Sequence, residues 1–148
     1  MKQWNSVDEI LQFAIVQEQQ AVEFYTDLAA RMEKPWVRKI FEEYADEERE
    51  HKRKLTTIKE GKLLQSAARD VLDLKIADYL IDVEPNAAMD YREALILAMK
   101  REKAAFKLYS DLAAASDDPQ VKDTLLRLAQ EEAKHKLRFE LEYDDTIR

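Results

Sequence analysis

The feature that most constrains the fold is an internal repeat, in which the second half of the chain follows the first at an offset of 84 residues without a gap. Residues 15–55 align with residues 99–139, and 14 of the 41 aligned positions are identical. Two unrelated helical segments of this composition would share fewer identities. The repeat therefore indicates a duplicated structural unit.

Each repeat reads as a helical hairpin, because the chain of 148 residues holds one glycine and three prolines and its apolar residues recur in steps of three and four. The pattern predicts a helix that begins after Ser6 and is ended by Pro35, and a second helix over residues 36–60 that is ended by Gly61. A third helix is predicted after Asp90. A fourth begins at residue 119, with Asp117 or Asp118 as its cap.

The stripes of apolar residues on these four helices predict the core of an all-α, four-helix bundle. The stripe positions are Val7, Leu11, Ala14, Ala21, Tyr25, Leu28 and Met32; Val37, Phe41, Tyr44, Leu55 and Ile58; Tyr91, Leu95, Ala98, Ala105, Tyr109 and Leu112; and Val121, Leu125, Leu128 and Phe139. Trp36, Phe24 and Phe106 are interpreted as core or interface residues.

A long crossover joins the two hairpins, where an up-and-down bundle would have a short loop. We expect one domain over residues 1–148, with hairpin one at about 6–60, the crossover at about 62–89 and hairpin two at about 90–145. Leu72, Ile76 and Leu80 suggest a short helix within the crossover. The stretch before Pro85 reads as extended, because proline disfavours a helical residue before it.

Composition excludes several classes of function. Cysteine is absent, which excludes disulfides, thiolate metal sites and a cysteine nucleophile. The net charge of −7 disfavours nucleic acid as a partner. No apolar run of about 18 residues is present, and the N-terminus lacks the apolar segment of a signal peptide. The sequence therefore predicts a cytoplasmic protein that does not bind membranes.

Charged and polar residues interrupt the apolar stripes at mid-helix, where a bundle is most buried. The repeat relates them in pairs, and we predict that all six meet at the bundle centre. They are Glu18, Glu48, His51, Glu102, Glu132 and His135.

Four ionised carboxylates cannot be buried together without compensation, because each costs many kcal/mol and neighbouring like charges add to that cost. No Lys or Arg occupies the central stripe positions, and protonation would require several strongly shifted pKa values. Two divalent metal ions balance four carboxylates, and two neutral imidazoles add ligands without charge. Oxygen and imidazole ligands without thiolates suit iron or manganese better than structural zinc.

The spacing of the two histidines supports this interpretation. They are the only histidines in the chain, and Glu48 and Glu132 each precede one of them by three residues. Residues three apart are neighbours on a helix, so that both side chains can reach one ion. The alternative is that Glu18 and Glu102 lie on solvated helix faces and that each histidine is a hydrogen-bonded core residue.

The segments EQQAVEFY with EREH, followed by EKAAFKLY with EAKH, resemble the ferritin-like di-iron carboxylate proteins, and their spacing is most similar to that of the rubrerythrins. The resemblance runs from about residue 6 to 143. It implies two iron ions bridged by Glu48 and Glu132, with Glu18 and Glu102 as terminal ligands. It also implies that the two histidines bind one metal each.

Two departures separate this chain from the rubrerythrins that it resembles. Those proteins carry a rubredoxin-like iron domain with four cysteines, which this chain lacks, so the resemblance implies an external electron donor. They also carry a further carboxylate one turn beyond the ligand of the third helix, where this chain has Ala105. The chain therefore resembles the stand-alone proteins grouped with rubrerythrin.

The favoured function is a di-iron redox protein that reacts with peroxide or O₂, as a peroxidase or a ferroxidase. The alternatives are iron storage and a non-catalytic bundle with a structural metal. Tyr25 and Tyr109 are either second-sphere hydrogen-bonding groups or one-electron donors, or else core aromatics. Asp27 and Asp111 are interpreted as solvated. We expect a homodimer.

Overall fold

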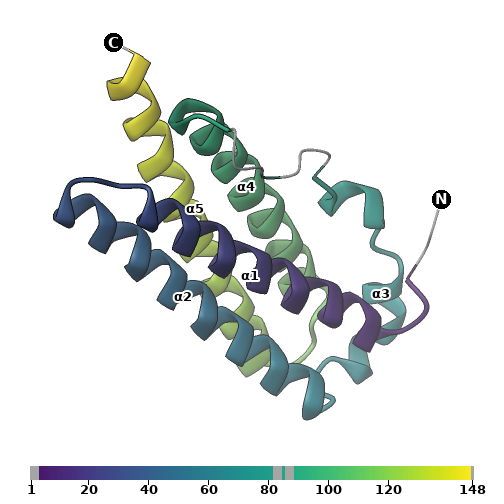
Figure 1. The fold of residues 1–148 in the computed structure, drawn as a ribbon. Helices are drawn as coiled ribbons and strands as arrows, with labels where there is room; N and C mark the ends of the chain where they lie inside the picture. The colour runs from purple at the N-terminus through teal and green to yellow at the C-terminus, as the bar shows by residue number, and fades with distance from the viewer. Residues whose placement is uncertain (1–3, 82–84, 86–88, 148) are drawn as a thin grey trace. The chain divides into compact units, whose positions relative to one another are not determined.

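The structure is a computed structural model that describes residues 4–81, 85 and 89–147. The described residues form helices joined by turns and loops. In chain order these are α1 (Val7–Ala30), α2 (Pro35–Glu60), η1 (Gln65–Ala67), α3 (Ala68–Leu72), η2 (Ile76–Tyr79), α4 (Tyr91–Ala115) and α5 (Pro119–Ile147) (Figure 1).

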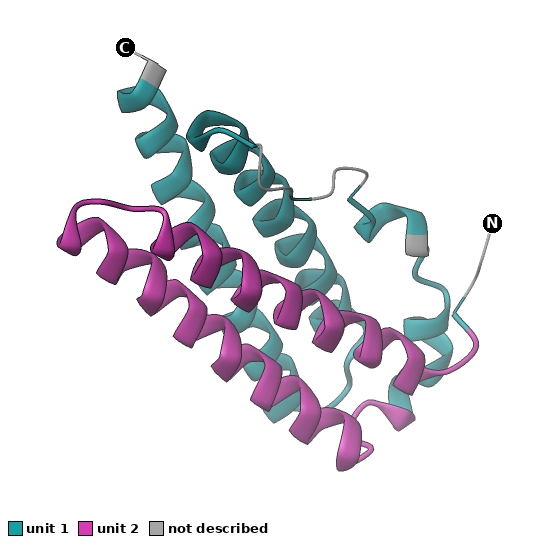
Figure 2. Cartoon of the chain, viewed as in Figure 1, with its two compact units in different colours: residues 1–4, 66–148 teal, residues 5–65 magenta. Residues whose placement is uncertain are grey.

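The chain divides into two compact units, which Figure 2 distinguishes by colour. One unit comprises residues 5–65 and is the hairpin of α1 and α2. The other comprises residues 1–4 and 66–148 and holds most of the crossover and the hairpin of α4 and α5. Within each unit the two long helices pack side by side (Figure 1). The two predicted hairpins are therefore confirmed, and the single domain over residues 1–148 stays a prediction.

Capping side chains fix where α1, α4 and α5 begin, as the sequence predicts. The Ser6 hydroxyl accepts a hydrogen bond from the backbone N–H of Glu9, and Asp90 forms a full capping box with Glu93. At α5 the Asp118 carboxylate accepts hydrogen bonds from the N–H groups of residues 120 and 121. The structure thus selects Asp118 over its neighbour Asp117 as the cap.

The first hairpin turn differs from the prediction. Helix α1 ends at Ala30, five residues before Pro35, and Met32 lies beyond the helix. Pro35 instead occupies the first turn of α2, where its missing N–H and fixed φ are tolerated. The proline therefore starts the second helix and does not stop the first.

Helix α2 ends at Glu60 and Gly61 caps it, as the sequence predicts. Gly61 caps the helix with an ordinary right-handed backbone, and Lys62 takes the left-handed conformation with φ of 55°. The N–H of Leu63 bonds to the carbonyl of Ile58, and that of Lys62 bonds to the carbonyl of Lys59. This is the Schellman pattern, with a lysine where glycine is usual.

Most residues of the predicted stripes form the core of each hairpin, whereas Val37, Tyr44, Tyr91 and Ala105 are only partly buried. Leu11, Tyr25 and Leu28 are buried in the first hairpin, and Leu95 and Leu112 are buried in the second. The large aromatic residues differ from one another in burial. Phe24 is buried, whereas Trp36 and Phe106 are 64% and 42% exposed, so that neither is a core residue within this chain.

The described part of the crossover forms three short helical elements, η1, α3 and η2, where the sequence suggested one. Its buried side chains include Leu64, Val71 and Tyr79, whereas Leu80, which the sequence assigned to the short helix, is 57% exposed. Leu80 itself has an extended backbone, as predicted. Part of the predicted extended stretch, residues 82–84, lies outside the described residues.

Candidate metal centre

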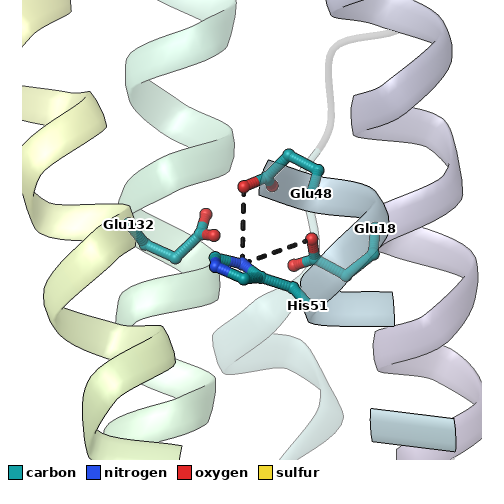
Figure 3. A group of neighbouring side chains, drawn as sticks. All are labelled: Glu18, Glu48, His51 and Glu132. Carbon is teal, nitrogen blue, oxygen red and sulfur yellow. Dashed lines mark ion pairs between the residues drawn. The ribbon is translucent and has the colours of Figure 1, made fainter. Parts of the chain in front are cut away.

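The first hairpin brings three of the predicted ligands together. Glu18 lies on α1, and Glu48 and His51 lie one turn apart on α2. Nδ1 of His51 is 3.4 Å from Oε1 of Glu48 and 3.6 Å from Oε2 of Glu18 (Figure 3). The three side chains are no more than 2% exposed. We call Glu18, Glu48 and His51 the first triad.

The second hairpin repeats this arrangement. Glu102 lies on α4, and Glu132 and His135 lie on α5, one turn apart. Nδ1 of His135 is 3.5 Å from Oε1 of Glu102. All three side chains are buried, with His135 the most exposed at 4%. Glu102, Glu132 and His135 are the second triad.

The local sequence explains why these polar groups are buried. Each ligand occupies a stripe position, so packing of the hairpin carries its side chain inward together with the apolar residues. Two small residues flank Glu18 on the same stripe of α1. Ala14 and Ala21 lie one turn before and one turn after it, and both are buried.

The distances within each triad fit shared coordination better than a hydrogen bond. Contacts of 3.4–3.6 Å between the imidazole nitrogen and carboxylate oxygens exceed the usual hydrogen-bond range. Two ligand atoms that are each about 2.1 Å from one ion lie roughly 3.0–3.4 Å apart at octahedral to tetrahedral angles. In each triad, one ligand atom from every residue lies within 4.8 Å of the others. The residues present therefore fit a metal ion.

The donor atoms also indicate which ions fit. Each triad offers two carboxylates and one imidazole, a set that suits iron, manganese or zinc and lacks the thiolates of structural zinc sites. Nδ1 of His51 and of His135 is the imidazole nitrogen that faces the carboxylates, so a metal ion held by either triad would be bound through Nδ1.

The two predicted tyrosines are buried in their hairpins, with Tyr25 at 0% and Tyr109 at 1% exposure. The ring centroid of Tyr25 lies 5.9 Å from that of Tyr44, in an edge-on arrangement. Whether either tyrosine acts as a second-sphere group or as an electron donor stays a prediction.

The sequence interpretation missed one buried polar contact. The Tyr79 hydroxyl donates a 2.7 Å hydrogen bond to Oδ2 of Asp111, and Lys107 contacts the same oxygen at 3.1 Å. Asp111 is thus half-buried and bonded, which corrects its interpretation as solvated, whereas Asp27 is exposed as predicted. No local signal predicts this contact, because Tyr79 comes from the irregular crossover.

Comparisons with known proteins agree with the geometry. The family model for rubrerythrin matches residues 9–143. A solved structure from Thermotoga maritima, described as that of a candidate ferritin-like diiron-carboxylate protein, is similar with a TM-score of 0.80 and 21% identity over 99% of each chain. Curated proteins give no match. The predicted all-α, ferritin-like fold is therefore confirmed.

A membrane-spanning helix was not expected from the sequence. Among the residues that the structure describes, none of the helices combines the length and the apolar character that crossing a bilayer requires.

Proposed function

The chain belongs to the rubrerythrin family, and on that premise we propose that it is a di-iron redox protein whose two triads together hold two iron ions. The observation that carries the proposal is the pair of buried triads, each with two carboxylates and one imidazole nitrogen directed at them. The repeat relates the triads residue by residue, as expected for two ions in equivalent surroundings.

Charge balance supports two ions. The triads contain four carboxylates, and two divalent ions would neutralise them fully, whereas one ion would leave two negative charges buried. In the proposed site Glu18, Glu48, Glu102 and Glu132 would supply the carboxylate ligands of the two ions. His51 and His135 each bind one ion.

The chain's own residues define the conditions for chemistry. Bound iron would supply the electrons that reduce peroxide or O₂. With two divalent ions bound, the four carboxylates would bring the net charge of the site to zero, and neutral imidazoles would not change it. Burial of all six side chains to at least 96% limits bulk water, which strengthens electrostatic interactions in the site.

The oxidant, the electron donor and the oligomeric state are further parts of this proposal. We favour peroxide or O₂ as oxidant, in a peroxidase or ferroxidase reaction, and manganese shares the same ligand preferences. Because the chain has no cysteine for an iron–sulfur or rubredoxin-type centre, its electrons come from an external donor. A homodimer and a cytoplasmic location complete the proposal.

An anaerobic Fe(II) titration tests this function, with wild type beside the double variant Glu48→Ala/Glu132→Ala. Two tight irons per chain in wild type alone are expected, and the loaded protein is then exposed to peroxide and, separately, to O₂. Faster oxidation by peroxide supports a peroxidase, and faster oxidation by O₂ supports a ferroxidase. Equal iron binding by wild type and variant contradicts the proposed site, and so does the absence of binding.

A further inference from the structure

The turn between α1 and α2 carries a charge opposite to that of the whole chain. Residues 31–39 contain four cations and one acid, a net charge of +3, whereas the chain has a net charge of −7. The same turn holds Trp36, whose exposed fraction of 64% is the largest among the exposed large hydrophobic side chains of the described residues. We call residues 31–39 the basic turn.

The basic turn is held in shape by its own contacts. Nη2 of Arg38 donates a 2.9 Å hydrogen bond to the carbonyl of Met32, which ties the first turn of α2 to the loop before it. Pro35 restricts the backbone at the helix start. Nζ of Lys34 lies 5.8 Å from the centroid of the Trp36 ring. A surface ordered in advance loses less entropy when a partner binds.

Two packed aromatic rings lie between the basic turn and the first triad on α2, a buried Phe41 and a half-buried Tyr44. Phe41 follows the turn on α2, and its ring centroid lies 6.2 Å from that of Tyr44. Tyr44 lies one turn before Glu48 and contacts Tyr25 at 5.9 Å. From residue 36 to residue 48 the helix rises about 18 Å, and the packed rings of Phe41 and Tyr44 lie within that span.

The internal repeat supplies a comparison within the same chain. The equivalent second turn, residues 115–123, contains three acids and one lysine, a net charge of −2. Gln120 stands in the position of Trp36, and Leu125 and Leu128 stand in those of Phe41 and Tyr44. The ligands are repeated in both hairpins, but the basic, aromatic surface and the rings beneath it occur only in the first.

We propose that the basic turn is the docking surface for the external electron donor, an acidic redox protein, and that electrons tunnel from it toward the first triad through the packed rings of Phe41 and Tyr44. This inference rests on the proposed function. Reduction of one hydrogen peroxide to two waters consumes two electrons and two protons. Two molecules of a one-electron donor are therefore oxidised per turnover, and solvent supplies the protons.

Charge and position favour a protein over other anionic partners. Nucleic acid and anionic membranes would also be attracted by four cations, but the rest of the chain carries a net charge of −10, which is the chain's −7 less the turn's +3, and this charge repels an extended polyanion. A small acidic protein can contact the basic turn alone. An exposed tryptophan beside cations is also the composition expected of a protein-binding hot spot.

Binding is tested first, because it does not require a loaded site. Calorimetric titration of an acidic [2Fe–2S] ferredoxin into the metal-free and iron-loaded protein is compared at low and high salt. We expect the affinity of both forms to fall at least tenfold in Lys34→Glu/Lys39→Glu. The matched control Lys100→Glu/Lys122→Glu, which reverses two exposed lysines of the second hairpin, should bind as wild type does.

Equal losses of affinity in the two double variants would overturn the docking site, since the effect would then be one of net charge. Binding of a basic cytochrome c, a DNA duplex or phosphatidylserine vesicles in preference to ferredoxin would overturn it as well. Because metal-free protein is included, failure to bind iron would refute the proposed function without deciding the docking result.

The aromatic path is tested by electron transfer to the iron-loaded protein in anaerobic stopped-flow measurements. Phe41→Leu/Tyr44→Leu introduces the residues of the second hairpin. We expect at least a tenfold slower oxidation of reduced ferredoxin at saturation, with ferredoxin affinity and iron stoichiometry unchanged. Phe139→Leu, which introduces the first-hairpin residue at that buried position, is the matched control. An unchanged rate in the double variant, or an equal loss in the control, would refute the path.

Discussion

Replacing Glu48 by glutamine should stabilise the metal-free protein and destabilise the loaded one. The carboxylates of the first triad offer ligand atoms within 4.8 Å of one another, and two unit charges at that distance repel by about 3–4 kcal/mol at an effective dielectric constant of 20. Glutamine keeps the shape of the side chain and removes one of these charges. After discounting for relaxation around the site, we expect a gain of about 1–3 kcal/mol in the metal-free free energy of unfolding.

The loaded protein should respond in the opposite direction. Loss of a charged ligand weakens iron binding, and an ion that binds only the folded state stabilises it by about 2.7 kcal/mol at a concentration of 100 Kd. Urea unfolding of wild type and Glu48→Gln, with and without anaerobic Fe(II), measures both effects. Glu43→Gln removes an exposed charge on the same helix and should change stability by no more than about 0.5 kcal/mol.

A metal site at Glu48 requires that Glu48→Gln change the stability of the metal-free and the iron-loaded protein in opposite directions. If Glu48→Gln destabilises the metal-free protein as well, Glu48 serves the fold and the first triad is a set of core hydrogen-bonding groups. If iron stabilises wild type and Glu48→Gln equally, the ion does not bind at Glu48.

Three further predictions concern the fold. Tyr79→Phe should cost about 1–2 kcal/mol, since it removes a hydrogen bond to the half-buried Asp111. Burial and Asp111 raise the pKa of Tyr79, so this stabilisation is fully present below about pH 10 and is lost as the pH rises further. The difference in unfolding free energy between wild type and Tyr79→Phe should therefore shrink above about pH 10. Parallel curves of unfolding free energy against pH up to about pH 11 would contradict the coupling. Lys62→Gly should raise the thermal midpoint. Glycine relieves the strain of the left-handed backbone at Lys62, about 1 kcal/mol, and this gain exceeds the stabilisation lost with the exposed ion pair to Asp8. A lower midpoint in calorimetry would contradict this. Asp118→Ala should cost about 1 kcal/mol in chemical unfolding by removing the cap of α5, and Asp118→Asn should restore most of it, whereas equal losses would exclude capping.

Much of this protein follows from local rules that its sequence obeys. The spacing of apolar residues places Leu11, Tyr25 and Leu95 inside a hairpin, because a helix presents residues three and four apart on one face. The same rule places Glu48 beside His51, and the repeat predicts a second triad without further assumption. The capping box at Asp90 is also local, because its partners are three residues apart.

Other features depended on contacts that the sequence does not encode locally. Tyr79 meets Asp111 across 32 positions of the chain, and the irregular crossover gives no periodic signal from which this contact could be predicted. The exposure of Trp36 was unpredictable for a related reason, since an aromatic residue at a turn is covered or uncovered by its neighbours in space. The sequence by itself determined the helices, their buried faces and the identity of the candidate ligands, because helical periodicity is a local property. Only the tertiary structure decided the ligand distances, the bonded state of Asp111 and which turn exposes a tryptophan, because these depend on packing between distant segments.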